Sequence, residues 1–377
     1  MMKQRKYLMY VTMGGMVAAY LFVATCNGEK MQQETQQTSA GANLATLSEA
    51  DQRLIQQSRS IFGALPASAE VETNPLNATK VELGKMLFHD ARLSKSSFIS
   101  CNSCHNLASY GVDNLPTSVG HNWQLGNRNA PTVLNAAFHM AQFWDGRAAD
   151  VEEQAKMPIL NEVEMALPHE EVGTGKIASI PEYQKLFAIA FPGEEIPLTY
   201  DNIGKAIAAF ERTLITPSRF DRYLEGDADA LTPQEKRGLE AFLTANCQTC
   251  HMTPLFGGHI YQKFGVMKDY WELTGSKAID RGRADVTKNE NESYVFKVPS
   301  LRNITRTYPY FHDGSIWDLK QAVAIMNELQ FGKKLGDQEI DDIVVFLGSL
   351  TGDIPESARL LPILPPSSGT TGLPDFQ

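Results

Sequence analysis

Cys101-Asn-Ser-Cys104-His105 is one of two Cys-X-X-Cys-His pentapeptides in this chain of 377 residues, and the other is Cys247-Gln-Thr-Cys250-His251. In this pattern two thiols can form thioethers with the vinyl groups of a haem, while the histidine that follows ligates the iron. Chance produces the pattern in a given window only roughly a few times in a million. The two motifs therefore predict two covalently attached c-type haems, and two haems in one chain imply electron transfer between two irons.

Three other roles for these cysteines fit less well. A zinc site places its second Cys-X-X-Cys about 15–20 residues after the first, whereas Cys104 and Cys250 lie 146 positions apart (250 − 104). A disulfide framework is typical of short chains with small cores, and 43% of this long chain is apolar. A thioredoxin-like site would not explain a histidine after both motifs.

Residues 1–26 have the features of a targeting segment, because basic residues precede an apolar stretch at positions 7–24. The end of that stretch, Val23-Ala-Thr-Cys26, resembles a bacterial lipobox with Cys26 as the lipidated residue, although Thr25 departs from the usual small residue. An uncleaved membrane anchor is the alternative, since the stretch is close to the lower length limit of a span. Both predict export to the periplasm, and residues 27–47 predict a flexible tether.

The rest of the chain predicts a mainly α fold with two cytochrome c-like helical haem domains in tandem. We expect an N-terminal domain at 48–225, a C-terminal domain at 226–354, and a Pro-rich tail at 355–377 that wraps back or hangs free. The net charge of −10 excludes a general affinity for nucleic acid and is compatible with small redox proteins as partners.

Helix signals precede both haem motifs. Thr79 and Glu82 have the spacing of a capping box, and so do Thr232 and Glu235, with Pro233 at the first helical position. Apolar residues at helical spacing predict a helix that closes each domain. These residues are Ile203, Ile207, Phe210 and Leu214 in the first domain and Ile343, Phe346, Leu347 and Leu350 in the second.

Five residues downstream of the first motif recur downstream of the second, each at an offset of 168 positions (299 − 131). Pro131, Asn135, Asp145, Gly146 and Asp150 correspond to Pro299, Asn303, Asp313, Gly314 and Asp318. The preference of loops for Pro and Asp-Gly explains the residue types but not the common offset. The offset therefore predicts duplicated domains, and the second copy holds 22 additional residues between its histidine and Pro299 (168 − 146).

The two copies differ where an iron ligand is needed. Met326 lies on a helical pattern, and a thioether opposite the histidine raises the potential of a haem and favours electron transfer. The same position in the first copy is Pro158 (326 − 168), which cannot ligate iron. The first haem therefore needs another ligand or an open face. Met157 is a candidate for a shifted ligand, although methionine on a helix usually fills the core.

Over residues 50–365 the chain resembles the bacterial di-haem cytochrome c peroxidase family. The matching stretches are 100–107, 120–123, 129–132, 143–148, 164–165 and 307–314. Most are weak individually, but their order and spacing are specific. The resemblance implies reduction of hydrogen peroxide to water, and so peroxide detoxification. A reduced cytochrome c or small copper protein would deliver electrons at the C-terminal haem, for use at the N-terminal haem.

The resemblance also implies site residues. His121, sixteen residues after His105, matches the distal ligand of the N-terminal haem, which must leave before peroxide can bind. Glu164 and Gln154 match an active-site glutamate and glutamine, and Trp144 matches a tryptophan between the haems. Without the family, these would be a loop histidine, surface polar residues and a core tryptophan.

Calcium is the remaining cofactor that the resemblance implies. Asn129, Thr307 and Pro309 match a site between the domains, where carbonyl and amide oxygens would suit a hard cation. His312 lies in the same loop, and its role stays open. Family members are often homodimers, so a homodimer is a further expectation.

Two alternatives belong to other classes of protein. A di-haem oxidase that modifies a partner protein resembles the same family but carries a tyrosine in place of Met326. A di-haem electron-transfer cytochrome would have two closed irons and would need neither Glu164 nor Gln154.

Overall fold

The computed structural model describes residues 47–377. The predicted targeting segment, Cys26 and nearly all of the predicted tether therefore lie outside the described residues. Between residues 47 and 377, no helix combines the length and apolar character of a membrane span. Helices predominate in this range, and its strands form a single two-stranded antiparallel sheet, so the predicted mainly α fold class is confirmed.

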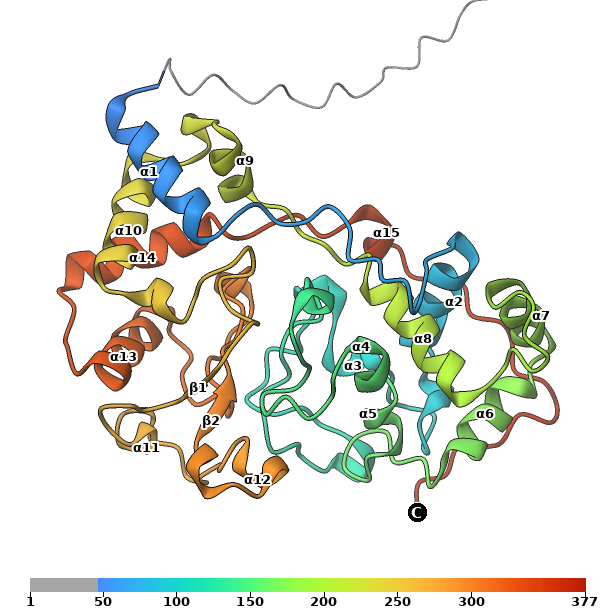
Figure 1. The fold of residues 1–377 in the computed structure, drawn as a ribbon. Coiled ribbons are helices and arrows are strands. Elements are labelled where there is room, and N and C mark those ends of the chain that lie inside the picture. The colour runs from blue at the N-terminus through green and yellow to red at the C-terminus, as the bar shows by residue number, and fades with distance from the viewer. Residues whose placement is uncertain (1–46) are drawn as a thin grey trace, which may run out of the picture. The chain divides into compact units, whose positions relative to one another are not determined.

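The N-terminal lobe comprises residues 63–218 and 355–377, which surround one hydrophobic core. Its centre is the packing of α2 against α8, with α7 beside them (Figure 1). The helices of this lobe are α2 (Ala78–His89), α3 (Cys101–Cys104), α4 (Val151–Gln154), α5 (Met157–Leu160), α6 (Glu170–Ala178), α7 (Pro181–Ala190), α8 (Tyr200–Glu211) and α15 (Glu356–Arg359).

The C-terminal lobe comprises residues 47–62 and 219–354, with two adjoining hydrophobic clusters. Its helices are α1 (Glu49–Ile61), α9 (Arg219–Glu225), α10 (Pro233–Thr244), α11 (Tyr270–Thr274), α12 (Ala284–Thr287), α13 (Leu319–Phe331) and α14 (Asp337–Gly348). Strands β1 (Tyr261–Lys263) and β2 (Val295–Lys297) pair in the segment between His251 and Pro299, where the second copy is longer than the first.

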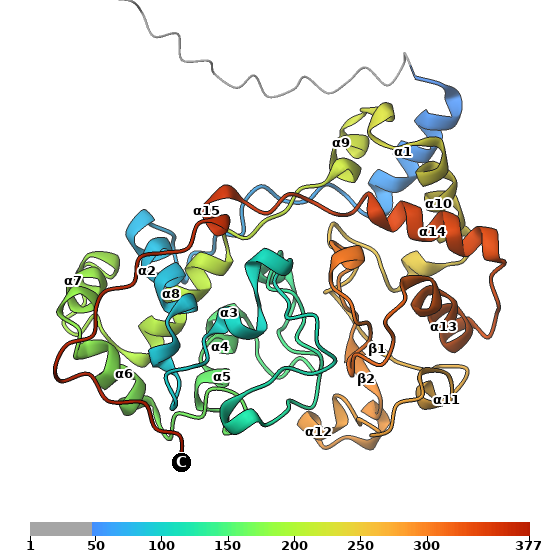
Figure 2. The same ribbon diagram turned by 180° about the vertical axis from the view of Figure 1, so that it is seen from behind.

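The hydrophobic packing divides the chain differently from the predicted boundaries of 48–225 and 226–354. Leu54 and Ile55 of α1 belong to the same core as Phe220 of α9 and Phe346 of α14. Phe62, just after α1, stacks on a phenylalanine of the C-terminal lobe with 4.1 Å between ring centroids. Figures 1 and 2 both place α1 beside α9, α10 and α14. Burial of these large apolar side chains, rather than position in the sequence, decides which lobe they join.

The tail at 355–377 wraps back over the N-terminal lobe (Figure 2). Ala358 of α15 is buried in the N-terminal core. Further along, the Thr371 hydroxyl lies 2.8 Å from that of Ser179, and the Asp375 N–H donates to the Lys95 carbonyl at 3.0 Å. The first of the two predicted conformations of the tail is therefore correct.

The predicted start of the first helix is wrong by two residues. Asn77, rather than Thr79, caps α2, because its side-chain oxygen accepts from the Lys80 N–H at 2.8 Å. The second predicted cap is confirmed: Thr232 and Glu235 form the capping box of α10. The eight apolar positions predicted for the two closing helices are all buried, but Leu214 and Leu350 lie beyond the ends of α8 and α14, so both helices end earlier than predicted.

The backbone repeats with the sequence offset. Asn135 and Asn303 both adopt left-handed conformations, with φ of 61° and 62°, which asparagine tolerates better than most residues. Both side-chain amides donate to the Thr216 hydroxyl, at 2.8 and 2.9 Å. Asp150 and Asp318 cap α4 and α13 by accepting from an N–H three residues on, at 2.8 Å in each case. These paired features support the predicted duplication.

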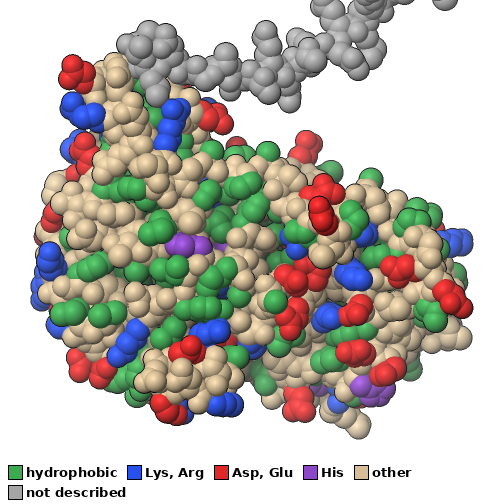
Figure 3. All heavy atoms as spheres, in the orientation of Figure 1, with side chains coloured by type: hydrophobic (Ala, Val, Ile, Leu, Met, Phe, Trp, Pro, Cys, Tyr) green, Lys and Arg blue, Asp and Glu red, His purple; other side chains and the backbone are tan. Residues whose placement is uncertain are grey.

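Acidic side chains gather over the N-terminal lobe on the face shown in Figure 3. Basic side chains on that face are fewer and scattered. This distribution agrees with the net charge of −10 and offers no positive groove for a nucleic-acid backbone on this face.

Candidate functional site

Each haem motif folds into one tight turn. Cys101 and Cys104 are the ends of α3, and Cys247 begins a 3₁₀ helix at Cys247–Thr249. In both copies the histidine N–H donates to the carbonyl of the first cysteine at 2.9 Å. The four cysteines of the motifs form no disulfide. The turns thus bring two free thiols and one imidazole together, as covalent haem attachment requires.

The C-terminal motif opens into a mostly apolar cavity that also contains Met326 of α13. Nδ1 of His251 donates to the Phe256 carbonyl at 2.8 Å, which leaves Nε2 available for iron. Burial lowers the pKa of His251 to about 4, so the ring stays neutral, as a ligand must. The cavity therefore fits a haem with imidazole and thioether ligands available. Met157, by contrast, is exposed at the start of α5.

The N-terminal motif is accompanied by a second buried imidazole. His121 is only 5% exposed, and neither of its ring nitrogens has a hydrogen-bond partner within the described protein. Buried polar atoms without partners are costly and rare, so iron ligation would account for this one. The next two residues, Asn122 and Trp123, both have positive φ, of 53° and 62°. Such a conformation is strained for tryptophan.

Glu164 lies close to both His121 and the N-terminal motif. The His121 N–H donates to the Glu164 carbonyl at 2.8 Å, and Asn161 Nδ2 donates to the Glu164 carboxylate at 2.9 Å. Burial raises the pKa of this carboxyl, against the opposing effects of Arg147 and Asn161. Gln154 is the last residue of α4 and is half-buried.

Trp144 is held at the boundary between the lobes. Its indole N–H donates to the Asn129 carbonyl at 2.9 Å, and its own carbonyl accepts from the Lys297 N–H of β2 at 2.7 Å. The Trp144 ring meets the buried ring of His312 edge-on, with 6.4 Å between centroids. All four residues line the cavity that holds the C-terminal motif. The two rings occupy corresponding positions of the repeat (312 − 144 = 168).

The predicted calcium ligands lie in one region. Asn129, Thr307 and Pro309 line the same cavity. Nδ2 of Asn129 donates to the Leu115 carbonyl at 2.9 Å, which leaves its Oδ1 free to accept a cation. Among the described residues there is no cluster of three acidic, histidine or cysteine side chains that could hold a metal. Any cation here would depend on neutral oxygens.

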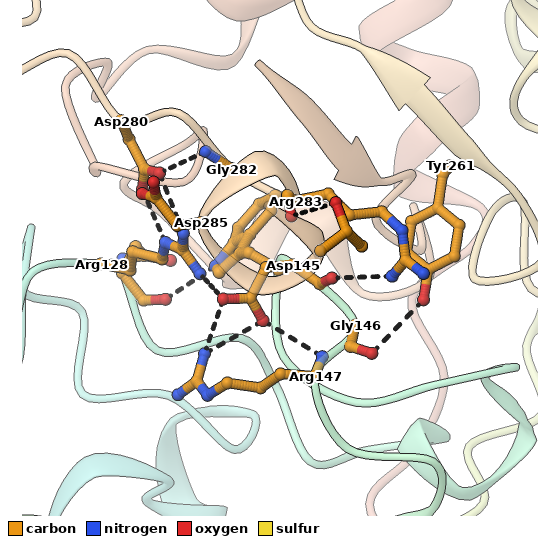
Figure 4. Close-up of polar contacts among 12 residues, drawn as sticks. Arg128, Asp145, Gly146, Arg147, Tyr261, Asp280, Gly282, Arg283 and Asp285 are labelled. Atoms are coloured by element: carbon orange, nitrogen blue, oxygen red, sulfur yellow. Dashed lines mark hydrogen bonds and ion pairs between the residues drawn. The ribbon is translucent and has the colours of Figure 1, made fainter. Parts of the chain in front are cut away.

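Three groups that were not predicted from the sequence also lie near these sites. Lys297 Nζ donates to Nδ1 of His139 at 2.8 Å, and burial lowers the pKa of the lysine to about 8. Glu211 of α8 is 4% exposed, and its charge contributes to raising the pKa of the Cys101 thiol. An ion network around Arg128 joins the lobes (Figure 4). Each pairing depends on tertiary contacts that no local spacing marks.

Comparisons with known proteins agree with this arrangement. A family model described as di-haem cytochrome c peroxidase matches residues 78–229, and one described as cytochrome c matches residues 235–351. A cytochrome c551 peroxidase of Nitrosomonas europaea is 52% identical over 298 residues, which cover 79% of this chain and 86% of the relative. The chain belongs to the di-haem cytochrome c peroxidase family. The predictions of the family, of an enzyme of this class and of two c-type haems are thereby confirmed.

Two further relatives define the extent of the similarity. A cytochrome c551 peroxidase of Pseudomonas aeruginosa is 47% identical over 330 residues, or 87% of this di-haem peroxidase and 94% of the relative. The crystal structure of a MauG-like protein associated with microbial copper homeostasis has a TM-score of 0.69 and 28% identity, and the match covers 79% of this chain and 95% of the other. Both cover the two lobes.

We predict that Glu211 makes stability depend on pH. Burial, and then the charge of Glu152, raises its pKa to about 8 from an ordinary 4.5. The folded state therefore holds a proton that the unfolded state releases, and the stability gained at low pH is lost as the pH rises from about 4.5 to 8. Glu211→Gln should remove on the order of 2 kcal/mol or more of this fall in the free energy of unfolding.

Denaturant unfolding of the holoenzyme at several pH values measures this effect. Glu225→Gln, an exposed change on α9, is the matched control and should follow the wild type. Parallel curves for wild type and Glu211→Gln would contradict the prediction.

Proposed function

We propose that this di-haem peroxidase reduces hydrogen peroxide to two waters, using two electrons and two protons. The bound haems supply the redox centres and the iron at which peroxide is cleaved. The proposal is carried by the difference between the two sites: a methionine shares the C-terminal cavity, whereas a buried histidine without a partner accompanies the N-terminal motif.

His251 and Met326 would hold the C-terminal haem, which would supply the entry point for electrons. Met326 would close the side opposite His251 and raise the potential of this haem, so that it accepts an electron from the donor and admits no peroxide. The donor would be a reduced cytochrome c or a small copper protein. The hydrogen bond from His251 to the Phe256 carbonyl supports this role, because it fixes the orientation of the ligand ring.

His121 would hold the iron of the N-terminal haem, where the electrons would be used, and would move away before peroxide binds. Two features support a ligand that can leave. Trp123, two residues after it, has a strained positive φ of 62° and so stores conformational energy close to the ligand. The ring itself has no hydrogen bond that would have to break, because both nitrogens lack partners within the described protein.

Glu164 is the proposed proton carrier and Gln154 the group that orients peroxide. A carboxylate can accept a proton from one peroxide oxygen and return it to the leaving oxygen, and it works best when its pKa lies closer to the working pH. Burial shifts the pKa of Glu164 in that direction. An amide can hold a substrate oxygen without titrating.

Trp144 would carry the electron path between the lobes. Its position at the boundary, held from Asn129 on one side and Lys297 on the other, supports this role. We also propose calcium at Asn129, Thr307 and Pro309, in the region where Trp144 is held.

The alternative activity is oxidation of a partner protein, which the MauG-like solved structure brings into consideration. Such an oxidase would carry a tyrosine where this chain has Met326, and Met326 lines the C-terminal cavity. A simple electron carrier is the other alternative, and the burial of Glu164 beside His121 favours the peroxidase over it. Export, a lipid anchor at Cys26 and a homodimer remain predictions from the sequence.

Glu164→Gln is expected to lower peroxide turnover by roughly 10²-fold or more, because the amide cannot carry the proton. Steady-state oxidation of reduced cytochrome c by peroxide measures this, with haem spectra as a check on folding. Glu162→Gln, two residues away and exposed, is the matched control and should retain wild-type turnover. Undiminished turnover in Glu164→Gln would remove this residue from the mechanism.

Spectra at defined redox states test the asymmetry of the haems. In the half-reduced enzyme we expect a high-spin ferric signal from the N-terminal haem, and His121→Ala should show that signal in the fully oxidised enzyme as well. Met326→Ala should instead lower the potential of the haem that is reduced first, by on the order of 0.1 V or more. A low-spin signal from both haems in all states of the wild type would favour the electron carrier.

Calcium binding is predicted to depend on Asn129. Isothermal titration of the chelator-treated holoenzyme should show one site, weakened at least tenfold in Asn129→Ala because one oxygen ligand is lost. Asn291→Ala, an exposed asparagine elsewhere in the C-terminal lobe, should bind as the wild type does. Equal affinity in the Asn129 variant would exclude this site.

A further inference from the structure

The guanidinium of Arg128 joins one carboxylate from each lobe (Figure 4). On the C-terminal side it binds Asp280 with two parallel contacts, from Nε at 2.6 Å and from Nη2 at 2.9 Å. On the N-terminal side Nη1 donates to Asp145 at 2.6 Å. Asp145 in turn accepts two contacts of 3.1 Å from Arg147. Asp280 lies between α11 and α12, whereas the other three belong to the N-terminal lobe.

This network is largely removed from water. The side chains of Arg128 and Asp280 are each 18% exposed, and that of Asp145 is 6% exposed. Hydrogen bonds from Arg128 keep the pKa of Asp280 below its usual range, although burial acts in the opposite direction. Buried, bidentate ion pairs of this kind impose a particular geometry more than they add stability.

The geometry that the network imposes concerns Trp144. Asp145 directly follows Trp144, and Asn129 directly follows Arg128. The Trp144 indole donates to the Asn129 carbonyl at 2.9 Å, while the Asn129 N–H donates to the His312 carbonyl across the boundary at 2.7 Å. The segment 128–129 therefore contacts the Trp144 ring and the carboxylate of the next residue, Asp145. It also binds the C-terminal lobe at Asp280 and at the His312 carbonyl.

Further contacts surround the Trp144 ring and the backbone that follows it. The guanidinium carbon of Arg128 lies 5.8 Å from the centroid of Phe296. Phe296 stacks on His312 at 4.4 Å, and His312 meets Trp144 edge-on at 6.4 Å. Nη1 of Arg283 donates to the Asp145 carbonyl at 3.2 Å, which fixes the backbone after Trp144 to the C-terminal lobe a second time.

We propose that Arg128 is a positioning residue for electron transfer between the haems, which holds Trp144 in a fixed place across the boundary between the lobes. This inference rests on the proposed function, in which electrons pass from the C-terminal to the N-terminal haem by way of Trp144. Arginine suits the task because its planar fork serves two carboxylates at once. Lysine is a single point charge and cannot bind both with the same directionality.

Stopped-flow kinetics of the holoenzyme can separate the two electron-transfer steps. The first is reduction of the C-terminal haem by ascorbate with a small mediator, and the second is its reoxidation after peroxide is added. In Arg128→Gln we expect the second step to be at least tenfold slower and the first to stay within twofold of wild type. Arg128→Lys and Asp280→Asn should fall between the two, because each keeps part of the network.

Arg237→Gln is the matched control, since it removes an arginine–aspartate pair of the C-terminal lobe with Asp342, away from Trp144. It should leave both steps unchanged. Wild-type reoxidation in Arg128→Gln, with both haem spectra intact, would overturn the proposal, and so would an equal slowing of both steps. If Arg128→Gln does not fold, wild-type rates in Arg128→Lys and Asp280→Asn would overturn it instead.

A failure of the proposed function gives a different result in the same experiment, because it is seen in the wild-type enzyme. If the wild-type enzyme shows no peroxide-dependent reoxidation of its C-terminal haem, the electron path itself is absent. The inference about Arg128 is then overturned together with it.

Discussion

A backbone hydrogen bond of 2.9 Å, from each motif histidine to the first cysteine of its motif, sets the geometry on which both sites depend. It closes a turn that keeps the two thiols and the imidazole of each motif close together, as covalent haem attachment requires. In the proposed function, the residues around each turn would supply the second iron ligand. Met326 of α13, which lines the cavity of the C-terminal motif, would do so in one lobe, and His121, two residues before the strained Trp123, in the other.

The duplication shows how two similar backbones can come to support different chemistry. Asn135 and Asn303 adopt the same left-handed conformation and meet at one threonine. At the same offset, however, Pro158 replaces Met326, so one copy lacks the thioether that the other presents. The two copies thus share a backbone conformation at the asparagines while they differ in a side chain that could ligate iron. The proposed division of labour between the haems follows from these substitutions.

Local patterns predicted the parts of this structure that depend on neighbouring residues. The capping box at Thr232 and the buried faces of the closing helices are as predicted, because a cap and a helical face are set within a few positions. The placement of α1 in the C-terminal core could not be predicted, since it depends on partners such as Phe346, far along the chain. The role of Arg128 could not be predicted for the same reason, because its partner Asp280 lies 152 positions away in the chain. Asn77 caps α2 in place of Thr79, because its side-chain oxygen accepts from the Lys80 N–H.

The chain passes from one hydrophobic core to the other three times: after Phe62, before Phe220 and before Ala358. During synthesis, therefore, neither core can be completed in one piece. The first helix must wait for partners that emerge much later, and the N-terminal core lacks Ala358 until nearly the whole chain has been made. Although the two lobes are built alike, cutting the chain between them would remove a helix from each core. The C-terminal core would lose α1, and the N-terminal core would lose α15. The two lobes therefore depend on each other's chain segments and form a single folding unit.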